Sequence, residues 1–230
     1  MLDIFITGEN IDLCIPTYDF ALEGTWNNWF NNPRITKYLE QGLFPNSREI
    51  QKDFFLSETK AQTRLMLIIA TKQQAYKGVV SLSNINLTKG IAEVAIVVDD
   101  RIEKKSSPYA ALEAISLITE HGFNVLGLNR ISARQNINLG GWQQRMELVG
   151  YRLEGIHKNE FVKGRLVENS ISIACIYDDF EKIVKKRGRL FDGTAEMKER
   201  FKSLPKTPFS QTLSSFLDES VKNYYEKLWK

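Results

Sequence analysis

The sequence has little of the material that metal and redox sites need. Its 230 residues include only two cysteines, Cys14 and Cys175, and two histidines, His121 and His157. Without a C-x-x-C pair we expect neither a zinc ribbon nor a redox motif, and two histidines leave little for a histidine metal site. We therefore predict no metal centre. We expect His121 to be packed on a long helix and His157 to lie on the surface of a hairpin.

Long apolar runs and a basic N-terminal region are also missing. The longest apolar run, residues 65–70, is much shorter than the about 20 residues that cross a bilayer. The N-terminal residues carry Asp3 and no basic region, so they do not predict a signal peptide. Lysine plus arginine number 31 and aspartate plus glutamate 28, a balance that does not indicate nucleic-acid binding. We expect a soluble, cytoplasmic protein with neither membrane nor nucleic acid as a partner.

Three widespread enzyme motifs are absent as well: G-x-S-x-G, G-x-x-x-x-G-K-[ST] and G-x-G-x-x-G. The apolar share of 43% and the charged share of 26% are those of an ordinary globular protein. The length favours one main domain with an appendage. We place the main domain at residues 1–180 and a basic and helical C-terminal extension at residues 181–230.

The pattern of apolar residues and turn signals predicts alternating strands and helices. Short turns separate three successive strands, which predicts an antiparallel meander. A long helix, a strand, a shorter helix and a hairpin follow. The predicted strands cover residues 10–16, 63–71, 77–85, 91–98, 130–135, 151–161 and 166–177. The predicted helical stretches cover 22–39 with a break at 31–33, one opening at Ser47, 108–124, 139–148, 194–204 and one in the last 20 residues.

Several short segments, in this order and spacing, resemble the GCN5-related N-acetyltransferase (GNAT) family, in its ribosomal-protein-acetyltransferase-like branch. The resemblance runs over residues 10–177. Its pieces are Gly78-Val79-Val80-Ser81-Leu82, Ala92-Glu93-Val94-Ala95-Ile96, Tyr109-Ala110-Ala111-Leu112-Glu113-Ala114, Leu126-Gly127-Leu128-Asn129-Arg130-Ile131, Leu148-Val149-Gly150-Tyr151 and Leu153-Glu154-Gly155. The resemblance implies an α/β fold with a mixed sheet, the acyl-CoA N-acyltransferase fold. In this fold the strands that hold Glu93 and Arg130 are parallel and splay apart.

The same resemblance implies acetyl-coenzyme A as the acyl donor and a small-molecule amine as the acceptor. The pantetheine arm would fill the gap between the splayed strands, and the pyrophosphate would lie at the start of the following helix, where free N–H groups favour negative charge. The residues that it assigns to cofactor binding are Val94, Ala95, Ile96, Lys104, Lys105, Ser106, Ser107, Tyr109, Ala110 and Asn138. The chain departs from the family pattern at Glu103, Ser106 and Pro108, where both loop glycines are missing, and at Met146, where the family often has tyrosine.

Glu93 interrupts an apolar strand and shares a face with Ala95 and Val97. A carboxylate there is costly unless it is paired or faces a wet cleft, so it is either a solvent-facing or salt-bridged edge residue, or a general base in the cleft. The resemblance favours Glu93 as the general base and Tyr109 as a proton donor. It also implies that Tyr38 and Glu40 touch the acceptor.

Three functions remain open at this stage. The segment over residues 26–45 resembles enzymes that acetylate nucleotide-linked amino sugars in surface-polysaccharide pathways. A protein N-terminus is a second acceptor, and the loss of both loop glycines leaves a non-catalytic binding module as a third reading. The C-terminal extension has too many apolar residues for a free tail, namely Leu213, Phe216, Leu217, Tyr224 and Trp229. We expect it to pack on the domain or on a second copy of the chain, as in a homodimer.

Overall fold

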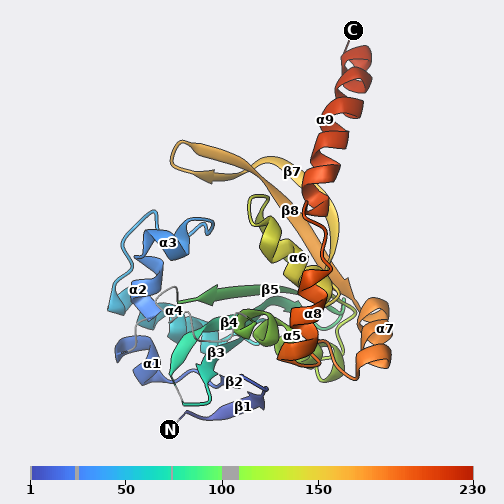
Figure 1. Cartoon of the computed structure of the whole chain (residues 1–230). Coiled ribbons are helices and arrows are strands. Elements are labelled where there is room, and N and C mark those ends of the chain that lie inside the picture. The colour runs from blue at the N-terminus through green and yellow to red at the C-terminus, as the bar shows by residue number, and fades with distance from the viewer. Residues whose placement is uncertain (1, 24–25, 74, 100–108, 230) are drawn as a thin grey trace.

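The computed structural model describes residues 2–23, 26–73, 75–99 and 109–229. Its centre is an eight-stranded sheet in the order β1-β2-β3-β4-β5-β6-β8-β7 (Figure 1). All neighbouring pairs are antiparallel except β5 and β6. The strands are β1 Ile4–Thr7, β2 Ile11–Cys14, β3 Leu65–Thr71, β4 Tyr76–Asn86, β5 Ile91–Val98, β6 Arg130–Asn136, β7 Arg152–Lys163 and β8 Leu166–Ile176. The mixed α/β fold and the meander over β3–β5 are confirmed. The edge strand β1 was not predicted.

Helices lie before, between and after the strands. Ser47 caps α4 as predicted, because its hydroxyl accepts a hydrogen bond from the Ile50 N–H at 3.2 Å. Pro33 opens the short α3 behind the cap residue Asn32. The helices are α1 Tyr18–Glu23, α2 Trp26–Phe30, α3 Pro33–Thr36, α4 Arg48–Lys60, α5 Ala110–Asn124, α6 Gly140–Leu148, α7 Tyr177–Arg187, α8 Thr194–Lys202 and α9 Phe209–Leu228.

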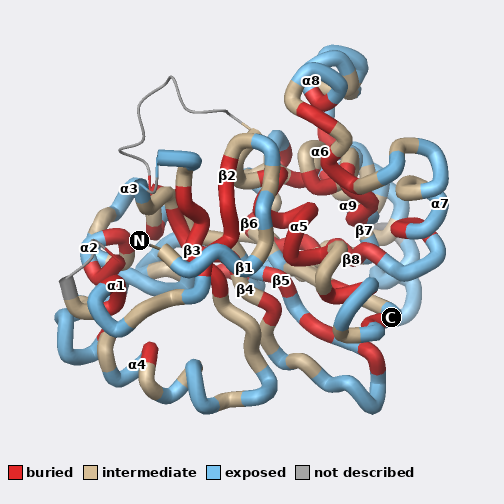
Figure 2. The backbone as a smooth tube through the Cα atoms, turned by 90° about the horizontal axis from the view of Figure 1, so that it is seen from below, coloured by how far each residue is buried: buried red, intermediate tan, exposed pale blue. Residues whose placement is uncertain are grey.

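The alternation of side chains along the strands builds one core on each face of the sheet. On β3, Leu67 and Ile69 join the core under α5, whereas Ile68 and Ala70 join a second core with Trp26, Trp29 and other residues of α1, α2 and α4. Figure 2 shows the buried residues along the central strands and α5, with exposed residues along α4 and the outer turns. Helices therefore cover both faces, as predicted.

The sheet opens between β5 and β6. Only three residue pairs join these strands, Ile91 with Arg130, Ala92 with Ile131 and Glu93 with Ser132. From Val94 onward β5 pairs only with β4, while β6 continues beside β8. The predicted splaying of the two central strands is confirmed, and a fork begins directly after Glu93.

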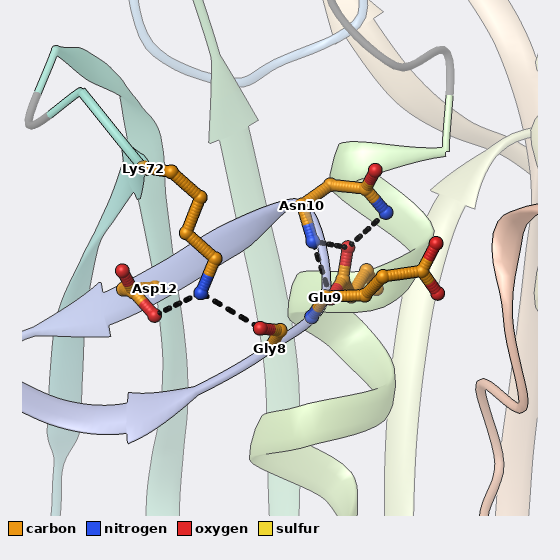
Figure 3. Close-up of polar contacts among 6 residues, drawn as sticks. Gly8, Glu9, Asn10, Asp12 and Lys72 are labelled. Atoms are coloured by element: carbon orange, nitrogen blue, oxygen red, sulfur yellow. Dashed lines mark hydrogen bonds and ion pairs between the residues drawn. The ribbon is translucent and has the colours of Figure 1, made fainter.

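A buried carboxylate on α5 holds the turn between β1 and β2 (Figure 3). Glu113 accepts hydrogen bonds from the backbone N–H groups of Glu9 and Asn10, the latter at 3.2 Å, and from the Asn10 side chain at 3.0 Å. A side chain at Gly8 would meet the Glu113 carboxylate at 2.3 Å, so this position requires glycine. On the other side of the turn, Lys72 bonds Asp12 at 2.6 Å and the Gly8 carbonyl at 2.7 Å. The turn is thereby tied to both α5 and β3.

Part of the C-terminal extension belongs to the main core. Leu190, Phe191 and Met197 are buried in the same cluster as the α5 side chains. The Leu190 N–H donates to Glu120 of α5 at 2.6 Å. The predicted boundary near residue 180 lies inside α7, and the division into two units there stays a prediction.

Helix α9 is fixed at its base and extends away from the sheet (Figure 1). At the base, Ser210 is buried and donates to Gln143 of α6, and Pro208 packs so closely on Gly140 that a methyl group there would lie 2.5 Å away. Farther along, Lys158 of β7 pairs with Asp218 at 2.9 Å. Large apolar side chains are exposed just before this pair, at Phe216, and beyond it, at Tyr224, Tyr225, Leu228 and Trp229. The first turn of α9 thus packs on the domain, whereas its outer turns do not.

Among the described residues, no helix is long and apolar enough to cross a membrane. The described part of the chain likewise holds no group of three or more histidine, cysteine, aspartate or glutamate side chains that could bind a metal ion.

Candidate active site

A polar cavity of about 490 Å³ lies at the fork between β5 and β6. Both prongs of the fork line it, β5 with residues 93–95 and β6 with residues 133–136. The segment after α3, the inner residues of β4, and the hairpin β7–β8 supply the remaining walls. The cavity is therefore formed where the sheet leaves backbone groups of β5 without a β6 partner.

Glu93 is the last residue of β5 that pairs with β6, and its exposed side chain lines the cavity. Its cross-strand neighbour on β4 is Ser83, whose hydroxyl donates to the Glu93 carbonyl at 3.4 Å. No described residue forms a hydrogen bond or ion pair with the Glu93 carboxylate. A salt-bridged Glu93 therefore receives no support, whereas a solvent-facing edge residue and a general base both agree with its exposed side chain.

Tyr38 and Glu40 line the same cavity as Glu93, so three of the predicted site residues come together. A lysine from the opposite side of the cavity holds their segment in place. Lys163, at the end of β7, donates to the carbonyl oxygens of Thr36, Leu39 and Gln41, the last two at 3.1 and 2.8 Å. Burial lowers the pKa of the Lys163 ammonium. The tip of the β7–β8 hairpin thus fastens the end of α3 and the residues after it.

Sequence reasoning did not identify the polar wall on β6, β7 and β8. Arg134 forms an ion pair with Glu160, and Ser170 donates to the same carboxylate. The buried Asn136 donates to Glu168 of β8 and accepts from the Asn138 N–H at 2.8 Å. Alternation along β6 could have indicated a polar face at Arg134 and Asn136, but the partners are far apart in the sequence.

Two predicted site residues lie away from the cavity. Tyr109 stands at the start of α5, and its ring packs edge-on against Phe201 of α8 with centroids 5.7 Å apart. Asn138 is exposed before α6 and does not line the cavity, whereas the nearby Asn136 does. The structure does not bring Tyr109 or Asn138 to Glu93, and their assigned roles stay predictions.

The residues assigned to the cofactor divide into three groups. Val94 and Ala95 line the cavity at the fork, and Ile96 follows on the unpaired length of β5. Ala110 begins α5, whose N-terminal N–H groups were expected to face the pyrophosphate. Lys104, Lys105, Ser106 and Ser107 lie outside the described residues.

The two cysteines are buried in the sheet, and their surroundings disfavour the thiolate form that a nucleophile needs. Burial raises the pKa of the Cys14 thiol, and it raises the pKa of the Cys175 thiol to about 12. Both stay protonated near neutral pH, whereas a nucleophilic cysteine needs its thiolate. Acyl transfer through a cysteine is therefore excluded by chemistry.

A sequence profile described as the acetyltransferase (GNAT) domain matches residues 17–150, more than half of the chain. The chain belongs to the GNAT family. It is an N-acetyltransferase of the acyltransferase class EC 2.3.1, and its acyl donor is acetyl-coenzyme A. The profile does not confirm the ribosomal-protein-acetyltransferase-like branch.

Solved structures share the fold of this GNAT protein. Spermidine N-acetyltransferase from Vibrio cholerae, in complex with CoA and spermine, is 18% identical with a TM-score of 0.66, and the match covers 75% of this chain and 98% of that one. A GNAT acetyltransferase from Bacillus anthracis is also 18% identical, with a TM-score of 0.64 and coverage of 76% and 99%. No curated protein matches the chain. At such identities the likeness concerns the fold.

Proposed function

We propose that this GNAT enzyme acetylates a polar primary amine bound in the cavity at the fork, with Glu93 as the general base. The observation that carries the proposal is the Glu93 carboxylate, which lies where β5 and β6 part and pairs with none of the described residues. A primary amine is protonated near neutral pH and attacks only after it loses a proton. A carboxylate within reach of that amine, directly or through one water, accepts the proton and accelerates the reaction by about 10²–10⁴-fold.

The fork can bind acetyl-coenzyme A through backbone groups of β5. Beyond Glu93, the edge of β5 that faces β6 has no strand partner over residues 94–98, and its N–H and C=O groups need other partners. The amide-bearing arm of coenzyme A offers such partners. Acetyl-coenzyme A supplies the thioester carbonyl and a thiolate leaving group. N–H groups near Val94 to Ile96 would hold the carbonyl oxygen as negative charge develops on it.

The pyrophosphate would bind over residues 104–110, as the sequence suggests. Lys104, Lys105, Ser106, Ser107 and Ala110 belong to this part of the proposal, which the start of α5 supports through its free N–H groups. Tyr109 faces α8, so we assign protonation of the leaving thiolate to water.

The polar lining of the cavity supports an amino sugar as the acceptor. Hydroxyl and amide side chains from Ser81, Ser83, Asn84, Gln135 and Asn136 could bind the hydroxyl groups of a sugar ring. A nucleotide carrier would bring a pyrophosphate, and the two cavity arginines, Arg64 and Arg134, are already paired with Glu58 and Glu160. The cavity lining therefore supports binding of the amino sugar more than binding of its nucleotide carrier.

One observation favours a second acceptor, a polyamine. Glu40 and Glu93 both line the cavity, and no described residue pairs with either carboxylate. Two unpaired carboxylates attract an acceptor with two or more ammonium groups. The Vibrio cholerae relative in the fold comparison is a spermidine N-acetyltransferase, which agrees with this candidate. A protein N-terminus has no comparable observation in its favour.

The test is a screen of the purified protein with acetyl-coenzyme A against amino sugars, nucleotide-linked amino sugars, polyamines and peptides, with released thiol as the readout. We expect turnover with an amino sugar or a polyamine. Glu93→Gln should lower kcat at least tenfold with little change in coenzyme A affinity, and higher pH should partly restore the rate by deprotonating the amine in solution.

Glu181→Gln is the matched control, because Glu181 is an exposed glutamate on α7 that pairs with none of the described residues. Equal rates for Glu93→Gln and the unchanged enzyme from about pH 6 to 9 would show that another group takes the proton. Coenzyme A binding without turnover of any amine would favour a non-catalytic binding module.

We also propose a second copy of the chain as the partner of α9, in a cytoplasmic enzyme. Support for the dimer comes from a stripe on α9 at Leu217, Val221, Tyr224 and Leu228, spaced four, three and four residues apart, as in helices that pair with their own kind. Support for the location comes from the two unpaired cysteines. Sedimentation of the full chain and of Phe216→Ser/Leu228→Ser tests the dimer, which the double variant should abolish.

A further inference from the structure

An apolar pocket of about 560 Å³ adjoins the polar cavity and has no role in the proposal above. The end of α2, the loop before α4 and one side of α4 form its walls, with the side chains of Phe30, Leu43, Phe44, Pro45, Ile50 and Phe54. Glu40 and Gln41 line this pocket and the polar cavity alike. The two spaces therefore share a wall, formed by the segment that Lys163 holds in place.

Large apolar side chains cluster at this pocket and are exposed to water. Phe44 is 85% exposed, Leu43 and Ile50 are each 56% exposed, and Phe54 is 36% exposed. On α4, Phe55 is buried in the core and Leu56 packs against it, whereas Ile50 and Phe54 line the pocket. An apolar pocket beside a polar reaction cavity is typical of a site that holds the unreactive part of a ligand.

We propose that this pocket is a subsite for an alkyl or aryl group carried by the acceptor amine. The acceptor then has two ends: an amino group near Glu93 in the polar cavity, and an apolar group against Phe44, Ile50 and Phe54. The argument for this occupant is that the two spaces lie side by side and share Glu40 and Gln41 as lining residues. This inference rests on the proposed function, because it assigns the pocket to the same acceptor.

The first experiment measures kcat/KM for a series of straight-chain primary amines from methylamine to octylamine, with phenylalkylamines as an aryl arm. Each methylene that enters the pocket should raise kcat/KM about two- to fourfold until the pocket is filled. Phe44→Ser/Ile50→Ser should flatten this rise and leave the value for methylamine unchanged. The matched control is Leu87→Ser, an exposed leucine in the turn after β4 that lines neither space.

A second measurement does not depend on turnover. The ¹⁹F signal of 4-fluorophenethyl alcohol, which has no amine, should broaden on binding to the full-length protein and to Leu87→Ser, and not to Phe44→Ser/Ile50→Ser. If no amine in the series is acetylated, this titration alone decides whether the subsite exists, and the screen with amino sugars and polyamines decides the proposed function separately.

Two results would overturn the subsite while the proposed function stands. One is acetylation of amines with no dependence of kcat/KM on chain length, or with equal dependence in the double variant. The other is a dimer, seen by light scattering, that Phe44→Ser/Ile50→Ser abolishes, since the pocket would then be an interface between two copies of the chain.

Discussion

Replacement of Glu113 by alanine removes the acceptor that holds the β1–β2 turn. The carboxylate of Glu113 is almost fully buried and receives the N–H groups of Glu9 and Asn10 together with the Asn10 side chain. In Glu113→Ala these donors lose their partner while the surrounding core, including Leu117 beside Gly8, still restricts the entry of water. In the variant, the N–H donors of Glu9 and Asn10 are therefore left without the acceptor that they have in the unchanged protein.

The size of the effect follows from two opposing contributions. Each partly buried donor left without an acceptor costs about 1–3 kcal/mol. Burial of the Glu113 carboxylate destabilises its charged form and raises its pKa, and Glu113→Ala removes this destabilising contribution. We expect a net loss of about 3 kcal/mol. For a chain of this length that corresponds to a fall in Tm of about 6–12 °C.

The dependence on pH has a definite sign. The pKa of Glu113 is raised in the folded protein, so the folded state holds this proton more tightly than the unfolded state. The contribution of Glu113 is then fully present below its ordinary pKa and decreases as the pH rises through the folded value. The difference in Tm between the unchanged protein and Glu113→Ala should therefore be larger at about pH 4.5 than at about pH 7.

Thermal unfolding followed by circular dichroism or calorimetry measures these differences. The Tm of Glu113→Gln should lie between that of the unchanged protein and that of Glu113→Ala, because the amide keeps one acceptor oxygen and adds a donor that faces other donors. Glu181→Ala, an exposed glutamate on α7, should change Tm by less than about 2 °C. A fall in Tm for Glu113→Ala no larger than that of Glu181→Ala would refute the reasoning.

Two further predictions concern the cavity and the core. Lys163→Met should raise the KM of the acceptor about tenfold with little change in coenzyme A affinity, because three carbonyl oxygens beside Tyr38 and Glu40 lose their donor. Lys163→Arg should recover most of the loss, and an unchanged KM in Lys163→Met would contradict the role of the hairpin tip. Cys175, with a thiol pKa of about 12, should resist iodoacetamide at about pH 8 in the folded protein, and rapid alkylation detected by mass spectrometry would contradict its burial.

Much of the fold was predictable because its signals are local. Apolar alternation and turns such as Lys89-Gly90, where Gly90 has a positive φ of 65°, specify the meander over β3–β5 without distant information. Strand β1 was missed because it is only four residues long and lies at an exposed edge. Its pairing depends on β2 and on the distant Glu113.

The site was predictable where the chain itself brings residues near the fork. Glu93, Tyr38 and Glu40 line one cavity because β5 and the segment after α3 both border the opening. Lys163 gave no signal, since a lysine beside a turn glycine is the usual pattern of a solvated hairpin. Its partners lie more than 120 residues away in the sequence. The role of Tyr109 stays a prediction, and its position at a helix start did not indicate that its ring packs against Phe201 of α8.

The fork also divides the sheet into two halves. Each half is one continuous stretch of chain, with β1–β5 in residues 4–98 and β6–β8 in residues 130–176. Three residue pairs join the two half-sheets, and the cavity has walls from both. If the chain were cut within the β5–β6 connection, each of the two fragments would carry part of the cavity wall. Catalytic activity in a mixture of such fragments would therefore report directly on their reassembly.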